Sequence, residues 1–256
     1  MNKKIIMLAG EGISTNFIFN SLKDNFNIST VIIEENENMK KFLKRRIKRL
    51  GYFKVIGQAV FQLIIPRLLR KLSKQRIDEI KRNYKLDNKS IPNSVIKKFI
   101  SVNSPECIAF IKKEKPDLII VNGTRIISKK VLNATDATFI NTHVGITPKY
   151  RGVHGGYWAL VNNDKKNCGV TVHLVDSGID TGGVLFQQKI TTTESDNFST
   201  YPFLQTGEGI LLMKQAVANF MNDKLKEVPS KTLESKLYYH PTIWFYLYKR
   251  VINGVK

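Results

Sequence analysis

The chain has 256 residues, of which 42% are hydrophobic and 10% aromatic, and it carries a formal net charge of +20. This length and apolar content suffice for one large α/β domain with a modest extension, and they exclude a minimal binding module. Cys107 and Cys168 lie far apart, with no second Cys or His at metal spacing. We therefore expect no structural disulfide and no metal site, and we interpret both thiols as those of a cytoplasmic protein.

The positive charge is concentrated in one segment. Residues 40–85 contain sixteen Lys and Arg residues and two acids, a net charge of +14. Apolar residues recur there every three to four positions, which predicts amphipathic helices, broken near Pro66, in a basic insertion at about 38–86. Its most apolar part, residues 55–69, falls short of the ~20 apolar residues of a spanning helix, so we do not expect it to cross a membrane.

Short apolar runs alternate with helical patterns in the rest of the chain. This alternation predicts an α/β fold with a Rossmann-like, mostly parallel sheet and helices on both faces. We place a catalytic domain at 1–200, and a C-terminal helix with an aromatic-rich extension, packed on that domain, at 201–256. Strands are expected at 4–9, 29–34, 98–102, 117–121, 137–141, 169–175 and 184–190, and helices at 14–23, 105–113, 156–162 and 201–221.

A glycine-rich turn follows the first predicted strand and opens a helix. The backbone amides at Gly10, Gly12 and Ser14 are placed to bind a substrate phosphate. A turn of small residues with Ser14 as the helix cap explains the same pattern equally well. Because the third glycine of the dinucleotide fingerprint is missing, we do not expect NAD.

An amide, an imidazole and a carboxylate follow one another in an order that suits acyl transfer. Asn141 and His143 alternate by two at the end of a predicted strand, so both project from one face, at the sheet edge where α/β proteins place their sites. Asp180 follows in a glycine-rich loop. Asn can donate to a developing oxyanion, His can carry a proton, and Asp can orient the His.

In this order and spacing the chain resembles the folate-dependent formyltransferases. The resemblance implies transfer of the formyl group of 10-formyltetrahydrofolate to an amine, with Asn141, His143 and Asp180 as catalytic residues. It is carried between residues 117 and 190 by Asp-Leu-Ile-Ile-Val-Asn-Gly-Thr-Arg-Ile-Ile at 117–127, Asn-Thr-His at 141–143, Pro-Lys-Tyr-Arg-Gly at 148–152 and Asp-Thr-Gly at 180–182.

The same resemblance implies two sets of binding residues. We rank His154 and His173 below His143 as catalytic candidates. We interpret His173 as a structural histidine or one that supports the catalytic residues from behind, and His240 as structural. The folate is expected at Thr124, Arg125, Ile126, Ile127, Asp176, Ser177 and Gly178. The acceptor is expected at Gly10, Gly12, Ser14, Lys149, Tyr150, Arg151 and His154.

The acceptor predicted first is an amino sugar, nucleotide-linked, in surface polysaccharide biosynthesis. The loop at 144–147 departs from the Pro-Ser-Leu-Leu-Pro of many family members, and the tail at 238–242 is similar to segments of sugar-modifying relatives. Phosphoribosylglycinamide formyltransferase of purine synthesis is the alternative, and a formyltetrahydrofolate hydrolase is the third.

A basic nucleic-acid-binding protein is the alternative outside the enzymes, although the intact triad speaks against it. Little more than a helix and an aromatic tail follow Thr200, which argues against tRNA, so we expect no nucleic-acid partner. The basic insertion suggests two further hypotheses, peripheral membrane contact and a homodimer. The expected location is the cytoplasm, with the inner face of the membrane as the site of any such contact.

Overall fold

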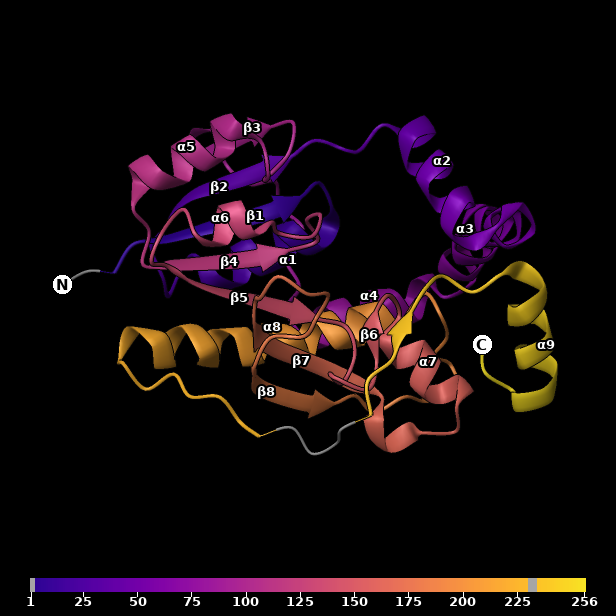
Figure 1. The fold of residues 1–256 in the computed structure, drawn as a ribbon. Coiled ribbons are helices and arrows are strands. Elements are labelled where there is room, and N and C mark those ends of the chain that lie inside the picture. The colour runs from indigo at the N-terminus through magenta and orange to yellow at the C-terminus, as the bar shows by residue number, and fades with distance from the viewer. Residues whose placement is uncertain (1–2, 230–233) are drawn as a thin grey trace.

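The computed structural model describes residues 3–229 and 234–256. A seven-stranded sheet forms its centre (Figure 1), and the strands are β1 (Ile5–Gly10), β2 (Ile28–Glu34), β3 (Ile96–Phe99), β4 (Leu118–Asn122), β5 (Thr138–His143), β7 (Gly169–Leu174) and β8 (Val184–Lys189). Their order is β3-β2-β1-β4-β5-β7-β8. The five strands from β3 to β5 run parallel, whereas β7 is antiparallel to β5 and β8. The predicted mostly parallel, Rossmann-like sheet is therefore confirmed.

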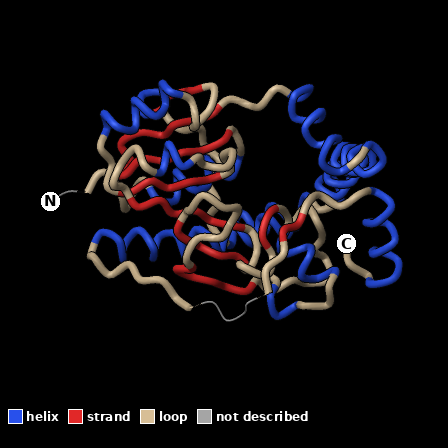
Figure 2. Tube along the Cα trace, in the orientation of Figure 1, coloured by secondary structure: helices blue, strands red, loops and turns tan. Residues whose placement is uncertain are grey.

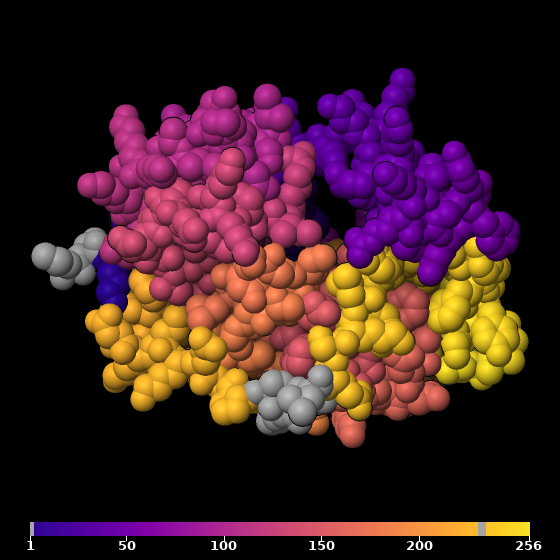
Figure 3. Space-filling view, viewed as in Figure 1, coloured from indigo at the N-terminus to yellow at the C-terminus, as the bar shows by residue number. Residues whose placement is uncertain are grey.

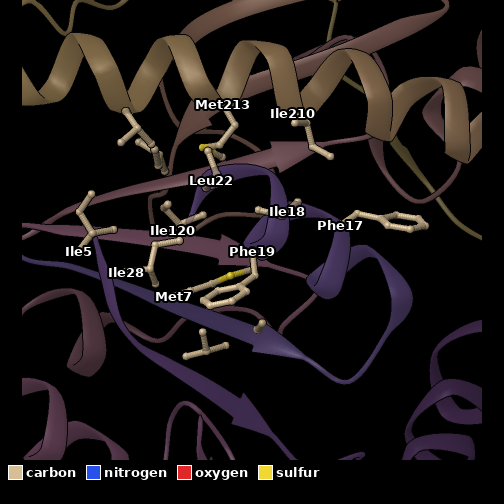
Figure 4. Packing of buried hydrophobic residues seen from close by; sticks show 14 of the residues in the cluster. Ile5, Met7, Phe17, Ile18, Phe19, Leu22, Ile28, Ile120, Ile210 and Met213 are labelled. Atoms are coloured by element: carbon tan, nitrogen blue, oxygen red, sulfur yellow. The ribbon is translucent and has the colours of Figure 1, made fainter. Parts of the chain in front are cut away.

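Helices cover both faces of this sheet, as expected. On one face, α1 and α8 contribute Leu22 and Met213 to a buried cluster with Met7 of β1 (Figure 4). On the other face, α5 and α6 contribute Cys107 and Val131 to a second cluster. The helices concerned are α1 (Ile13–Leu22), α5 (Pro105–Glu114), α6 (Lys129–Leu132) and α8 (Tyr201–Met221).

The division predicted at residue 200 cuts through this core. Helix α8 begins at Tyr201, and its Ile210 and Met213 are at most 4% exposed against the sheet. This helix therefore belongs to the core of the region predicted as the catalytic domain. The expected strand at 98–102 lies earlier, at Ile96–Phe99, because it pairs in register with Val31–Glu34 of β2.

The basic segment is helical, as predicted. It forms α2 (Met39–Leu50), α3 (Tyr52–Leu72) and α4 (Lys74–Asn83), and a further helix, α9 (Ile243–Asn253), lies in the aromatic tail. Figures 1 and 2 show α2, α3 and α9 together at one end of the molecule, apart from the central sheet. The remaining elements are α7 (Gly155–Val161), two 3-10 turns at Asn93–Val95 and Lys165–Asn167, and a parallel pair of short strands, β6 (Arg151–Gly152) and β9 (Leu237–Tyr238).

The break expected near Pro66 is wrong, because α3 continues through this residue. Phe61, Ile65 and Leu69 are at most 8% exposed and hold both sides of the proline on the core. Tertiary packing of this kind overrides the cost of the missing backbone donor. The chain turns instead at Gly51, whose φ of 81° favours glycine.

Among the described residues, α3 is the one helix whose length and apolarity would suit a membrane span. The most apolar stretch of this helix has a mean hydropathy of 1.2, and 33% of that stretch is buried within the protein. The sequence interpretation underestimated this length, because it took only residues 55–69 as the apolar part. A single helix of this kind is weak evidence for a span, since core helices of soluble proteins pass the same test.

Candidate functional site

A cavity of about 410 Å³ lies at the carboxyl ends of β4 and β5. Open α/β sheets commonly bind ligands at this edge. Asn141 and His143 line the cavity together, as their alternation on one strand predicted. The loop between β7 and β8 brings Asp180 to the same cavity. The structure therefore brings the three predicted catalytic side chains into one site.

His143 is held between a backbone carbonyl and a carboxylate. Its Nε2 lies 2.7 Å from the carbonyl oxygen of Tyr150, which can only accept, so Nε2 donates. Its Nδ1 lies 3.3 Å from Oδ2 of Asp180. Burial lowers the pKa of His143 despite the opposing effect of the nearby Asp180 charge, so the imidazole is neutral at pH 7. The nitrogen that faces Asp180 is then unprotonated.

Asp180 is fixed by its own backbone and by three partners. It has a φ of 51°, in the left-handed region, which few residues other than glycine occupy. Its Oδ2 accepts a hydrogen bond of 2.9 Å from the backbone N–H of Gly152, and its Oδ1 lies 3.7 Å from Nε2 of His173. Burial raises the pKa of Asp180, whereas attraction to His173 and His143 in their protonated forms and the hydrogen bond from the Gly152 amide lower it, and the net pKa is lowered. The carboxylate is therefore ionised.

His173 contacts the site more directly than the sequence predicted. Its Nδ1 lies 2.6 Å from the carbonyl oxygen of Leu174, so Nδ1 donates and Nε2 is left to accept. Nδ2 of Asn141 lies 3.2 Å from that Nε2. The pairing of Asn141 with His173 across the antiparallel strands β5 and β7 creates this contact. Sequence spacing could not reveal it, because the two residues lie far apart along the chain.

The residues predicted to hold the folate mostly line this cavity. Thr124, Ile126 and Ile127 do so from the loop after β4, as does Arg125. The guanidinium of Arg125 turns back to bond Glu34 at 3.1 Å and the carbonyl of Ile100 at 2.8 Å, so its charge is already paired. From the second loop, Asp176 and Gly178 line the cavity and Ser177 is outside the set of lining residues.

The side chains of three residues predicted to meet the acceptor point elsewhere. Nζ of Lys149 lies 3.0 Å from Asp164 and 2.8 Å from Glu234, and the Tyr150 hydroxyl donates to Asp164 at 2.9 Å. Neither side chain lines the cavity, because the partly buried Asp164 attracts both. Only the backbone of Tyr150 reaches the site, through the carbonyl that accepts from His143. Arg151 likewise bonds the carbonyl of Ile179 at 3.0 Å rather than facing the cavity.

The glycine-rich turn serves the fold at one position. A side chain at Gly10 would collide with the carbonyl of Gly123, so these two loops approach closely only because residue 10 is glycine. Gly12 caps α1 with its backbone only, and Oγ of Ser14 accepts from Asn122 at 3.2 Å. The predicted cap at Ser14 is therefore wrong, because α1 begins at Ile13 and Ser14 lies inside it, but these contacts agree with a structural role for the turn.

A second cavity of about 370 Å³ adjoins the first. Ser14 and His154 line it, as predicted for the acceptor, together with residues that the sequence did not single out, which are Gln62, Pro66 and Arg70 of α3 and Phe198 before α8. His240 also lines it, and its Nδ1 lies 3.0 Å from Nε2 of His154. Burial lowers the pKa of His154 to about 3 and that of His240 to about 4.

Comparison with known proteins bears on these predictions. The family model described as formyl transferase matches residues 73–204, which is about half of the chain. A methionyl-tRNA formyltransferase of Caldanaerobacter subterraneus subsp. tengcongensis is 30% identical over 142 residues, covering 55% of this chain and 45% of that protein. The chain therefore spans about half the length of the curated relatives that it matches.

Several solved structures share the fold at low sequence identity. A sugar N-formyltransferase from Shewanella sp FDAARGOS_354 superposes with a TM-score of 0.58 and 16% identity, covering 92% of this chain and 76% of that chain. Phosphoribosylglycinamide formyltransferase from Streptococcus pneumoniae TIGR4 superposes with a TM-score of 0.55 and 19% identity, covering 86% of this chain and 99% of that chain. WlaRD, a sugar 3N-formyl transferase in the presence of dTDP and 5-N-formyl-THF, superposes with a TM-score of 0.53 and 18% identity. The alignment covers 93% of this chain and 70% of that chain.

Proposed function

The chain belongs to the formyl transferase family, and on this premise we propose that it moves the formyl group of 10-formyltetrahydrofolate to the amine of an amino sugar. The observation that carries the proposal is the convergence of Asn141, His143 and Asp180 in one cavity with the loop at 124–127. The predicted family is confirmed by the match, and the substrate is the part that is proposed. The triad and the binding residues stay predictions about function.

Asn141 is placed to stabilise charge on the carbonyl oxygen of a formyl group. One N–H of its Nδ2 donates to His173, at 3.2 Å, and the second N–H is left for the cavity. An amide donor held in advance by a neighbour stabilises a developing oxyanion, and removal of one such donor typically costs about 10²–10³ in rate. His173 is thus a positioning residue for Asn141.

His143 and Asp180 are placed to accept the proton that leaves the attacking amine. The unprotonated Nδ1 of His143 and Oδ2 of Asp180 face each other at 3.3 Å, so two acceptors meet without a proton between them. A proton taken from the amine satisfies both atoms, and the pair can return it to the folate nitrogen as the bond between that nitrogen and the formyl carbon breaks. Because the pKa of each group is lowered, both atoms are unprotonated before the reaction. When bound, the formyl-folate supplies the activated formyl group, and the residues at 124–127, Asp176 and Gly178 would hold it.

The second cavity supports a nucleotide-linked acceptor. Arg70 provides a cation, and Ser14 lies in the first turn of α1, where backbone N–H groups favour a phosphate. The two cavities are linked along the chain, since Val153 lines the first and His154 the second. The similarity to sugar N-formyltransferases agrees with this assignment, and we propose surface polysaccharide biosynthesis in the cytoplasm as the place of the reaction.

Phosphoribosylglycinamide is the second candidate acceptor. The fold covers 99% of the Streptococcus pneumoniae enzyme, and that acceptor also carries a phosphate for the first turn of α1. Helix α3 of the basic segment lines the second cavity and so adds surface that could contact an acceptor larger than phosphoribosylglycinamide. A homodimer and peripheral membrane contact stay predictions from the sequence.

The deciding experiment offers the full chain 10-formyltetrahydrofolate with a panel of nucleotide-linked amino sugars and phosphoribosylglycinamide. Mass spectrometry reports the acceptor that gains one formyl group. We expect a nucleotide-linked amino sugar to gain it, with Asp180→Asn as the inactive control. Formylation of phosphoribosylglycinamide alone would replace the proposed acceptor with the second candidate.

A further inference from the structure

Helices α2, α3 and α9 form one end of the molecule and carry charge of a single sign. Their sequences contain thirteen Lys and Arg residues and no Asp or Glu. Elsewhere in the chain acids and bases are mixed, since the whole sequence has 21 acidic and 41 basic residues. This end of the molecule is therefore suited to an anionic partner.

Helix α3 is apolar on both of its sides. One side is buried on the core through Phe61 and Ile65. The opposite side exposes Ile56, Leu63 and Ile64 by 57%, 54% and 52%. A surface helix normally presents polar residues to water on that side. Within the described part of the chain, the second apolar side of α3 is therefore exposed to solvent.

Helix α9 carries a matching stripe. Trp244, Leu247, Tyr248 and Val251 follow one another at the i, i+3, i+4 and i+7 spacing of one helix face, and they are exposed by 39%, 48%, 58% and 81%. Together, α3 and α9 hold twelve of the eighteen large hydrophobic side chains that are exposed in the described part of the chain. Exposed apolar surface is thus concentrated on two helices.

The two apolar faces form one continuous surface. The ring of Trp244 occupies the space above Gly57, where any side chain would collide with it. The same ring stacks on Phe53 with a centroid distance of 4.3 Å. A groove of about 730 Å³ runs along this seam, lined by Phe53, Trp158, Pro241, Trp244, Phe245 and Tyr248 among others. Figure 3 shows the violet and yellow segments adjoining at this end.

A row of cations borders this apolar surface. Lys40, Lys41, Lys44 and Lys48 of α2 are exposed, and no ion pair joins them to the described residues. Helix α2 is fastened to α3 by hydrogen bonds of 3.2 and 3.0 Å from Arg46 to Gln58, so the row keeps its place beside the apolar surface. An aromatic and aliphatic surface with a border of lysines matches the layers of a bilayer interface.

We propose that α2, α3 and α9 form a docking face for the surface of a bilayer that contains anionic lipids. The exposed residues of α3 and α9 enter the boundary between headgroups and acyl chains, where Trp and Tyr are favoured. The cations of α2 bind the lipid phosphates, and their aliphatic stems lie along the apolar region. The face includes none of Asn141, His143 and Asp180, and the α3 residues that line the second cavity, Gln62, Pro66 and Arg70, are not among the residues assigned to docking.

Two other occupants fit the face less well. A second copy of the chain would place the exposed lysines of α2, Lys40, Lys41, Lys44 and Lys48, against a second such set, which is repulsive. A nucleic acid would neutralise the cations but would leave the apolar side chains of α3 and α9 in water. A bilayer satisfies both the charge and the apolar surface.

Vesicle flotation with the full chain tests the proposal. Neutral phosphatidylcholine vesicles are compared with vesicles in which about a third of the lipid is phosphatidylglycerol, at low and high salt. We expect flotation with the anionic vesicles only, weakened but retained at high salt because apolar insertion is insensitive to screening. No flotation with anionic vesicles at low salt would overturn the docking face.

Paired variants separate the two contributions. Lys40→Gln/Lys41→Gln/Lys44→Gln/Lys48→Gln and Leu247→Ser/Val251→Ser should each weaken binding about tenfold or more, since each cation and each buried apolar group contributes to such binding. Matched controls that remove the same charge or apolar groups elsewhere should bind as the wild type does. These controls are Lys112→Gln/Lys113→Gln/Lys129→Gln/Lys130→Gln and Ile100→Ser/Leu211→Ser, all at exposed positions.

Three results would contradict the proposal. Equal loss in the control variants would indicate nonspecific adsorption of a cationic protein. Unchanged binding of Leu247→Ser/Val251→Ser would exclude apolar insertion. A concentration-dependent dimer in sedimentation, abolished by that same double variant, would assign the face to a second copy. Formyl transfer by the variants in solution should match the wild type, so loss of docking is distinguishable from failure of the proposed activity.

Discussion

His173 accepts a hydrogen bond from Asn141 across two antiparallel strands, with 3.2 Å between Nε2 and Nδ2. This contact settles which way the Asn141 amide points, because Nδ1 of His173 is already used by the carbonyl of Leu174. The amide is then presented to the cavity by a neighbour that does not itself need to touch the formyl group. Its importance can be measured separately from binding.

Replacement of His173 by Phe should lower kcat by about 10²-fold with little change in KM, because the oxyanion donor loses its orientation. Gln at this position can still accept from Asn141 and should restore at least part of the rate. Steady-state kinetics of both variants give the comparison, and circular dichroism checks the fold. Equal rates for the Phe and Gln variants would indicate that the contact is only structural.

The pH dependence of the reaction should report on His143 and Asp180. Both pKa values are lowered, and the pair accepts a proton during the reaction, so it must be unprotonated at the start. We expect kcat/KM to stay level as the pH decreases past ~6.5, the ordinary pKa of a histidine, and to fall only at lower pH, by up to ~tenfold per unit. Asp180→Asn should remove about 10²-fold in rate. A profile that rises toward acid pH would exclude the assigned proton acceptor.

His154 and His240 should make the protein sensitive to acid. Their pKa values in the fold are about 3 and about 4, whereas an unfolded chain binds these protons near pH ~6.5. The unfolded state therefore takes up more protons below pH 6.5, and stability falls as the pH drops toward 4, by up to ~1.4 kcal/mol per unit for each group. Urea unfolding at pH 7 and pH 5 measures this. The slope should be smaller in His240→Gln, and an unchanged free energy at the two pH values would contradict the argument.

One ion pair should hold the basic segment on the domain. Arg76 of α4 bonds both oxygens of Asp196 at 3.0 and 2.9 Å, and the Asp196 side chain is fully buried. Burial raises the pKa of Asp196, but Arg76 and Thr193 outweigh it, and the net pKa is lowered. Arg76→Met should cost about 3–5 kcal/mol, because it leaves a buried carboxylate unpaired.

Chemical denaturation of Arg76→Met measures that cost, and a second substitution should relieve part of it. Adding Asp196→Asn removes the orphaned charge, so the double variant should be more stable than Arg76→Met. If Arg76→Met unfolds like the wild type, the pair contributes nothing to the attachment of α4. Lys81→Met, at a long surface contact of 3.9 Å with Asp78, serves as the control and should change stability little.

The sequence patterns predicted the parts of the fold that depend on local signals. The helix after Ser104 begins as expected, because Oγ of Ser104 caps it and Pro105 occupies its first position. Asn141 and His143 were found because two-residue alternation places them on one side of β5. Their convergence with Asp180 followed from the family resemblance rather than from spacing.

Long-range contacts were beyond these patterns. The role of His173 depends on the register between β5 and β7. Lys149 and Tyr150 turn toward Asp164, a partly buried carboxylate fourteen or more residues away. Pro66 looked like a helix end because the local rule holds only where packing does not override it. The aromatic tail was expected to pack on the domain, but its helix and the face it shares with α3 appear only in three dimensions.

The most direct test of the account is a comparison of wild type and Asn141→Ala in formyl transfer from 10-formyltetrahydrofolate to a nucleotide-linked amino sugar. Product formation is followed by mass, and folate binding is measured in parallel by fluorescence. We predict that the wild type formylates the sugar amine, while Asn141→Ala binds folate normally and turns over about 10²–10³-fold more slowly. Wild-type turnover by Asn141→Ala, or folate binding without any formylated amine in the wild type, would contradict it.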